Sequence, residues 1–166
     1  MTQLVALVQP QNTVPTTVEI VDIAGLVKGA SKGEGLGNKF LADIRETPAI
    51  LHVLRCFEDD NIVHVDGSVD PIRDKEVIDT ELQLKDLETV ETRMQKVAKQ
   101  ASIGDKDARK QLDLYERVKT ALEQGISARA VEREDSEEAL FQEMQLLTGK
   151  PILYVCNVEE GAVVEG

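Results

Sequence analysis

The chain has 166 residues, 19 basic and 31 acidic side chains, a formal net charge of −12 at pH 7 and no Trp. This length suffices for one domain, whose core must be built from Leu, Val, Ile and Ala because aromatic residues make up only 3% of the chain. No apolar run approaches the roughly 20 residues of a transmembrane helix, and the first residues do not form a signal peptide. We therefore expect a cytoplasmic protein with no membrane partner.

The first predicted element is a strand over Thr17–Asp22, followed by a loop with glycines at positions 25, 29, 33, 35 and 37. Asp22 at the end of a strand can hold a metal ion through water, and the N–H of Gly25 can approach a terminal phosphate closely. This Asp-x-x-Gly pattern indicates a nucleotide-dependent switch. The alternative is an ordinary strand that ends in a turn.

A helix over Asn38–Arg45 and two further strands, Ile50–Phe57 and Pro151–Asn157, complete the α/β part of the prediction. Short, nearly continuous apolar runs separated by helices favour a buried parallel sheet. Cys56 and Cys156 lie in these runs, so we expect buried thiols in a reducing compartment.

The region Val77–Leu147 contains no Pro and consists mostly of helix-forming residues. Apolar residues recur there at alternating spacings of three and four, which predicts two antiparallel helices packed as a short coiled coil. The turn is expected near Ser102–Asp105, where Gly104 ends one helix and Asp105 caps the next. A further helix should begin at Asp135 or Ser136. The seam residues are Leu87, Val90, Met94, Val97, Ala101, Ala108, Leu112, Tyr115, Val118 and Leu122.

The tip of this hairpin is basic although the chain as a whole is acidic. Residues 93–110 hold six basic and two acidic side chains, a local balance of +4. Such a tip could contact RNA phosphates in a salt-dependent manner. The alternative is a solvated helix face, for which charge runs are usual. The basic residues considered for RNA contact are Lys96, Lys99, Lys106, Arg109 and Lys110.

The segment DIAGLVKGASKGEGLGNKFLADIRE, residues 22–46, resembles the second switch of the Obg-like ATPases, the YchF family of P-loop NTPases. The similarity continues through residues 55–58, 61–65 and 151–160 and covers essentially the whole chain. It implies a partial G-domain-like parallel sheet with an inserted antiparallel helical hairpin. Residues 1–74 and 145–166 would form an incomplete nucleotide-binding core, and residues 75–144 the insertion.

The resemblance also implies roles for residues at the ends of the strands. Asp22 would hold Mg²⁺ indirectly and Gly25 would contact the γ-phosphate. Asn157, Val158 and Glu160 match the family's Asn-x-x-Glu, which replaces the Asn-Lys-x-Asp that reads guanine and implies a preference for ATP over GTP. On these few residues alone, a turn after a strand is the alternative.

Leu26 follows the switch glycine at the position where Ras-like GTPases carry the Gln that orients the attacking water. Leucine cannot orient water, and the resemblance supplies His64 for this role. A histidine in an apolar context is otherwise commonly structural. The polar residues on both sides of His64 favour the functional interpretation.

No Gly-x-x-x-x-Gly-Lys-Ser/Thr motif occurs in the sequence. We therefore expect an internal fragment of such a protein, without the P-loop and the C-terminal TGS domain, that hydrolyses ATP negligibly by itself. The resemblance implies association with the ribosome or RNA. The alternative function is a non-catalytic module that binds RNA, the ribosome or a protein through the basic tip. The sequence does not indicate an oligomeric state.

Overall fold

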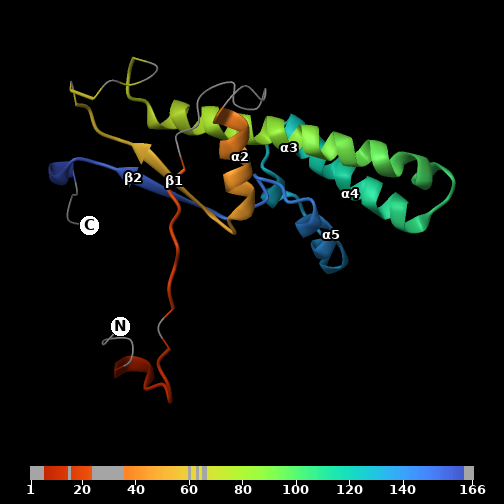
Figure 1. Ribbon diagram of the computed structural model, residues 1–166, viewed down its shortest axis with the longest axis horizontal. Coiled ribbons are helices and arrows are strands. Elements are labelled where there is room, and N and C mark those ends of the chain that lie inside the picture. The colour runs from red at the N-terminus through yellow and green to blue at the C-terminus, as the bar shows by residue number, and fades with distance from the viewer. Residues whose placement is uncertain are drawn as a thin grey trace.

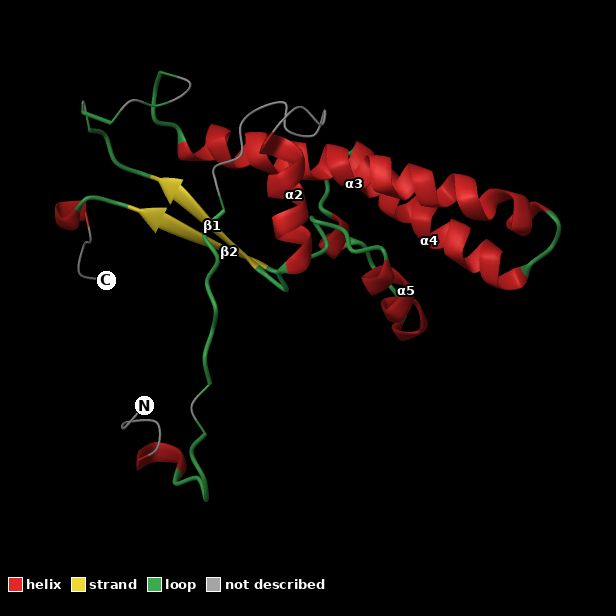
Figure 2. Cartoon of the chain, viewed as in Figure 1, coloured by secondary structure: helices red, strands yellow, loops and turns green. Residues whose placement is uncertain are grey.

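A computed structural model describes residues 6–14, 16–23, 36–59, 61–62, 64 and 67–162. Two strands and helix α2 lie at one end of the molecule, and a long helical hairpin extends to the other (Figures 1 and 2). Within the described ranges, one-turn 3-10 helices span Ala128–Ala130, Asp135–Glu137 and Glu160–Ala162. The main elements in chain order are α2 (Leu36–Glu46), β1 (Ile50–Arg55), α3 (Pro71–Ser102), α4 (Lys106–Glu123), α5 (Glu138–Glu143) and β2 (Ile152–Asn157).

Strands β1 and β2 pair in parallel, with register from Ile50 opposite Ile152 to Arg55 opposite Asn157. This confirms the two predicted strands and the helix before them, each to within two residues at either end. The pairing extends one residue further, because the amide of Cys56 donates to the carbonyl of Asn157 at 2.8 Å. The carboxyl ends of both strands therefore meet at one edge of the sheet.

The predicted strand over Thr17–Asp22 is wrong for this structure. Residues 16–23 belong to no strand and run as an extended segment away from the sheet (Figure 1). Val18 and Ile20 are 82% and 73% exposed. Alternating β-branched residues favour extended backbone, but a strand also needs a neighbour to accept its hydrogen bonds. Only Ile23, at the end of the segment, packs against the core.

Helix α3 begins with a well-formed amino-terminal cap. The side chain of Asp70 accepts hydrogen bonds from the amides of Ile72 and Arg73, and Pro71 occupies the first helical position, where its missing N–H costs nothing. The helix has 32 residues, which corresponds to a length of about 48 Å at 1.5 Å per residue. It starts six residues before the predicted helical region.

Helices α3 and α4 pack side by side and are joined by a tight turn (Figure 2). Gly104 takes a φ of +100°, which favours glycine, and Asp105 caps α4 by accepting from the amides of Asp107 and Ala108. The predicted turn and cap are therefore confirmed. Six of the ten predicted seam residues are buried. Leu87, Met94 and Val97 are partly buried and pack against the core cluster, whereas Leu112 is partly buried and is not among the residues of that cluster.

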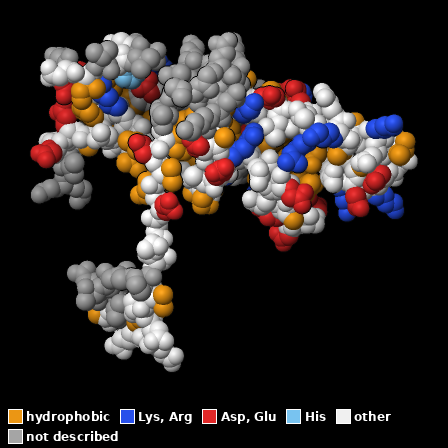
Figure 3. All heavy atoms as spheres, viewed as in Figure 1, with side chains coloured by type: hydrophobic (Ala, Val, Ile, Leu, Met, Phe, Trp, Pro, Cys, Tyr) orange, Lys and Arg blue, Asp and Glu red, His pale blue; other side chains and the backbone are white. Residues whose placement is uncertain are grey.

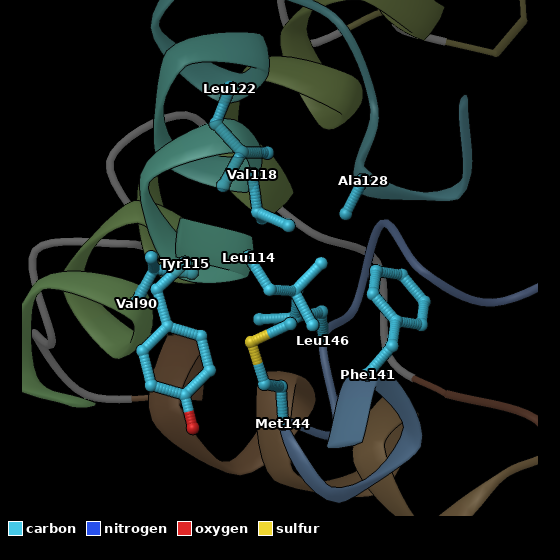
Figure 4. Close-up of a cluster of buried hydrophobic side chains, with 9 residues drawn as sticks. All are labelled: Val90, Leu114, Tyr115, Val118, Leu122, Ala128, Phe141, Met144 and Leu146. Atoms are coloured by element: carbon cyan, nitrogen blue, oxygen red, sulfur yellow. The ribbon is translucent and has the colours of Figure 1, made fainter. Parts of the chain in front are cut away.

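Leu114 is the core residue of α4 that the helical spacing missed. It is fully buried and points toward Met144 and Leu146 (Figure 4). Helix α4 packs against α3 on one side and against the segment around α5 on another, so its apolar surface is wider than a single seam. The spacing of apolar residues along one face of α4 predicts its contact with α3 but not its contact with the segment around α5.

The predicted helix after residue 135 starts where expected but is short. A 3-10 turn at Asp135–Glu137 leads into the six-residue α5. Gln145 has a φ of +52°, outside the helical region, so the chain leaves the helix there. Met144, Leu146 and Leu147 are nevertheless buried, because the irregular segment itself packs against the hairpin.

A second core cluster of Leu41, Ile44, Leu82 and Leu147 joins α2 to α3 and to the segment before β2. Asp86 of α3 is fully buried beside it. Its carboxylate accepts from the amides of Leu147 and Thr148 at 2.8 and 2.7 Å and from the Thr148 hydroxyl at 2.7 Å. Burial nevertheless raises the pKa of Asp86 above its ordinary value.

Described residues cover one face of the sheet, and they leave the other face exposed. Leu51, Val53, Leu153 and Val155, which form two facing pairs, are all exposed. Cys156 is exposed and Cys56 only partly buried, so the expectation of two buried thiols is wrong. None of the helices in the described ranges is both long and apolar enough to cross a membrane.

Candidate nucleotide site and hairpin tip

The predicted base-reading residues lie at the carboxyl edge of the sheet. Asn157 is the last residue of β2, Val158 follows it, and Glu160 begins a 3-10 turn. All three are exposed. The carbonyl of Asn157 is engaged by Cys56, which holds the end of β2 against the end of β1. The backbone at this edge is thus fixed while the side chains remain accessible to a ligand.

Arg55, the last residue of β1, organises the loop at the same edge. Its guanidinium donates to the carbonyls of Phe57, Ile62 and Asp59 at 3.1, 2.9 and 3.3 Å. It also stacks 4.9 Å from the centre of the Phe57 ring. No signal in the sequence set Arg55 apart as a residue that holds this loop.

The two cysteine thiols lie next to each other at this edge. Burial, together with a hydrogen bond to the thiol of Cys156, raises the pKa of Cys56. A raised pKa disfavours the thiolate, which is the nucleophilic form. The thiol of Cys56 is therefore a weaker nucleophile than an ordinary cysteine at neutral pH.

His64 lies in the segment between the sheet and α3. Its Nε2 is 2.9 Å from Oδ2 of Asp74, in the first turn of α3, and its side chain is 17% exposed. The structure thus places His64 in a partly buried setting with a carboxylate partner. The sequence did not predict this partner, because the two residues are ten positions apart, across a loop and a helix start, and no local pattern links them.

The described residues include only part of the predicted phosphate site. Asp22 is exposed, and no hydrogen bond or ion pair connects it with the carboxyl edge of the sheet within the described ranges. Gly25 lies outside the described residues. The described part of the chain holds no group of three or more His, Cys, Asp or Glu suited to a metal. Mg²⁺ is commonly held by one or two carboxylates with phosphates and waters, and the exposed carboxylate of Asp22 fits such indirect binding.

The residues predicted at the hairpin tip separate into two kinds. Lys96, Lys99, Lys106 and Lys110 are exposed, and basic side chains gather at this end of the molecule (Figure 3). Arg109 is exposed as well, but it also donates from Nε to the carbonyl of Ala101 at 3.1 Å and so satisfies the end of α3. The four lysines make no hydrogen bond or ion pair within the hairpin among the described residues, and we call them the tip lysines.

Comparisons with known proteins identify the family and the fold. A sequence profile described as "50S ribosome-binding GTPase" matches residues 2–100. The chain is 54% identical over 158 residues to the ribosome-binding ATPase YchF of Escherichia coli O157:H7, covering 95% of this chain and 44% of that protein. It is 53% identical over 163 residues to the Bacillus subtilis protein of the same name, covering 98% and 44%.

A solved structure, the YchF GTPase of Schizosaccharomyces pombe, superposes with a TM-score of 0.74 at 37% identity. The match covers 96% of this chain and 44% of that one, so the chain spans less than half the length of the relatives it matches. The similarity shows that the two strands and their helices are part of a P-loop GTPase-like α/β fold. The chain therefore belongs to the 50S ribosome-binding GTPase family and, within it, to the YchF proteins.

Proposed function

We propose that this chain is part of a ribosome-associated ATPase that binds ATP, and GTP less well, together with Mg²⁺. The observation that carries the proposal is the exposed Asn157–Glu160 segment at the carboxyl edge of a parallel sheet. Ligands of open α/β sheets bind at this edge. Relatives named as ribosome-binding ATPases support the choice of nucleotide and partner. A ribosomal partner would also place the chain in the cytoplasm.

Each candidate residue has a distinct task in this proposal. Asn157 and Glu160 contact the base and Val158 lines it, while Gly25 offers its amide to the γ-phosphate. Asp22 holds Mg²⁺ through water; when bound, the ion neutralises charge on the phosphates. His64 orients the attacking water, because Leu26 has no polar group with which to do so.

We also propose that different segments of the chain have different functions. Residues 1–74 and 145–166 form the nucleotide-binding part, and residues 75–144 form a coiled-coil insertion. The sequence contains no P-loop motif, which in related enzymes supplies the phosphate cradle and a Ser/Thr metal ligand. We infer that the chain by itself hydrolyses ATP negligibly.

Magnesium-dependent binding of fluorescent ATP and GTP analogues tests the nucleotide site. We would compare this chain with a chimaera in which the preceding segment of the Bacillus subtilis relative, including any P-loop, is joined to its start. The chimaera should bind ATP more tightly than GTP, and this chain should bind neither. Absence of binding by the chimaera would overturn the roles of Asp22, Asn157 and Glu160.

Substitutions in the chimaera then test which residues contact the base. Asn157→Ala or Glu160→Gln should weaken ATP binding by roughly 10-fold or more, since each removes a polar contact worth about 1.4 kcal/mol. Glu159→Gln is the matched control, because it removes the same charge from the neighbouring position. Equal effects of Glu159→Gln and Glu160→Gln would indicate a general loss of charge and not a base contact.

The tip lysines favour a second candidate function, binding of RNA or the ribosome without catalysis. Four exposed cations project from the end of a rigid hairpin on a chain of net charge −12. Replacing Lys96, Lys99, Lys106 and Lys110 by Gln should weaken co-sedimentation with ribosomes and reduce its salt dependence. The control is a second variant with the same charge change at Lys75, Lys85, Lys119 and Arg129, away from the tip. If both variants bind equally, the tip is not the contact surface.

A further inference from the structure

The contact between His64 and Asp74 defines both the position and the tautomer of the His64 ring. A carboxylate can only accept hydrogen bonds, so the 2.9 Å contact requires that Nε2 of His64 carries the proton and donates it to Oδ2 of Asp74. In the neutral imidazole, the other nitrogen, Nδ1, is then the basic one. A carboxylate behind a histidine is a common means of holding both the tautomer and the orientation of the ring.

Asp74 is itself held from the opposite side. Arg73 approaches its other oxygen, Oδ1, at 3.3 Å from Nη2. The same guanidinium donates to the hydroxyl and the carbonyl of Ser68 at 3.0 and 2.6 Å. Both carboxylate oxygens of Asp74 therefore have defined partners, and its side chain is only 23% exposed.

The backbone around Asp74 is also fixed. Its amide donates to the carbonyl of Asp70 at 2.9 Å, which is the first hydrogen bond of α3, and Asp70 caps the helix. The amide of Gly67 donates to the carbonyl of His64 at 3.1 Å, which ties the backbone of His64 to the segment before α3. The carboxylate thus stands on the rigid start of a 32-residue helix, whereas His64 lies on a loop.

We propose that Asp74 is the positioning residue for His64: it draws the imidazole to the start of α3 and keeps the proton on Nε2, so that the ring is held in one orientation and one tautomer. This inference rests on the role proposed above for His64. Asp74 does not touch the reacting groups, and its effect on hydrolysis passes entirely through His64.

If Asp74 had only a structural role, it would stabilise α3 without any effect on His64. An acidic residue in the first turn of a helix stabilises the helix through the macrodipole whether or not a histidine is nearby. Asp79 provides a matched control, because it lies on the same helix five residues later and pairs with Lys75 at 2.6 Å. Replacing either aspartate by Asn removes one charge from α3. Asp79→Asn removes the pair with Lys75, whereas Asp74→Asn removes the contacts with both His64 and Arg73.

The first test is the tautomer of His64 in this chain, read from long-range proton–nitrogen NMR correlations of ¹⁵N-labelled protein. The spectra would be recorded at about pH 8, above the ordinary imidazole pKa of about 6.5. His64 should be protonated at Nε2 in the parent chain and in Asp79→Asn, and should become a mixture of both tautomers in Asp74→Asn. An unchanged tautomer in Asp74→Asn would overturn the proposal.

The spectra contain their own control for folding. His52, the other histidine, lies in β1 with its ring centre 5.6 Å from that of Tyr154, and its signals should stay in place in Asp74→Asn. Asp79→Asn should shift them, because burial lowers the pKa of His52 and the charge of Asp79 acts on the ring to raise it. If Asp74→Asn disturbs His52, Asp74→Glu is the second variant. It keeps a negative charge at the helix start but moves the acceptor by one methylene, so it should alter His64 alone.

The second test is a kinetic cycle in the chimaera described above. Asp74→Asn should lower kcat for ATP hydrolysis by roughly 10- to 100-fold, the range for residues that orient a functional histidine, with little change in KM. In a His64→Ala background, Asp74→Asn should have no further effect on kcat. A further loss in that background would mean that Asp74 acts independently of His64 and would overturn the proposal.

The two tests separate failure of this inference from failure of the proposed function. If His64→Ala leaves hydrolysis unchanged, His64 has no role in catalysis and the kinetic role of Asp74 falls with it, although the NMR result still reports the contact. If His64→Ala abolishes hydrolysis but Asp74→Asn changes neither kcat nor tautomer, only the positioning role is wrong.

Discussion

The helical hairpin and the two-stranded sheet bury their apolar residues to very different degrees. Val90, Leu114 and Val118 of the hairpin are completely buried. In the sheet, Val53 and Leu153 are 62% and 61% exposed, and the outer face has no cover among the described residues. Because burial of apolar surface is the main source of stability, the hairpin is expected to supply most of the folding free energy.

This difference matters because the candidate nucleotide residues are in the less buried region. Asn157 and Glu160 follow an exposed strand, and Asp22 follows an unpaired segment. Regions with few buried contacts open locally at a small cost in free energy. The comparison indicates that the hairpin is a stable platform, while the nucleotide edge depends on further contacts or on ligand for its order.

The largest effect should come from the core of the hairpin. Leu114→Ala is expected to lower the free energy of unfolding by about 4 kcal/mol, because it removes a fully buried side chain and leaves a cavity among Met144, Leu146 and α4. Urea unfolding followed by circular dichroism at the helical minimum measures the change.

Leu153→Ala is the matched control in the sheet, since it makes the same chemical change at a position that is 61% exposed. It should cost less than about 1 kcal/mol. A cost near that of Leu114→Ala would mean that the outer face of the sheet is covered in solution, and the contrast between the two regions would disappear.

The next effect concerns Asp86, which connects the two regions from α3. Asp86→Ala should destabilise the chain by about 3 kcal/mol, because it leaves the buried amides of Leu147 and Thr148 without an acceptor. The control is Glu88→Ala, on the exposed side of the same helix. Hydrogen exchange should show faster opening of β2, which follows Thr148, with the tip of the hairpin unaffected; uniform opening would contradict a local connecting role.

The stability contributed by Asp86 should also depend on pH in a defined direction. Its pKa in the folded chain is raised above the ordinary value of 3.8 by burial, so the folded state holds this proton more tightly than the unfolded state does. Stability from this group is therefore present below about pH 4 and is lost as pH rises through the raised pKa.

Asp86→Asn isolates this dependence, because asparagine does not titrate. The difference in unfolding free energy between the parent chain and Asp86→Asn should decrease as pH rises from about 4. An increase over the same range would mean that the three hydrogen bonds to the carboxylate outweigh its burial and depress the pKa.

The two regions also differ in how far the sequence predicted them. In the hairpin, periodic apolar residues and the Gly104–Asp105 pair fixed the turn and most of the seam, since these signals are local. Leu114 was missed because its partners are about 30 residues away in a segment without regular structure. Residues 17–22 have the composition of a strand, but no partner strand pairs with them in the described ranges.

For the candidate site, motif resemblance identified residues but not their surroundings. Asn157 and Glu160 lie where expected, at the end of β2, because strand ends are encoded locally. The pairing of His64 with Asp74 depends on how the loop returns to α3, which no local pattern describes. Arg109 looked like the tip lysines in sequence, yet its guanidinium is used within the hairpin.

The smallest effect tests the turn that joins the two long helices. Asp105→Ala removes the side chain that accepts from the amides of Asp107 and Ala108, and it should cost about 1 kcal/mol, the usual value of a helix cap. Asp107→Ala is the control, because it removes a carboxylate from the same turn without removing the cap. Because the hairpin is expected to hold most of the stability, the loss at Asp105 should appear in global urea unfolding and not only in exchange of amides near the tip. A loss confined to the tip would show that α3 and α4 fray there independently, and that the stable platform is the part of the hairpin near α5.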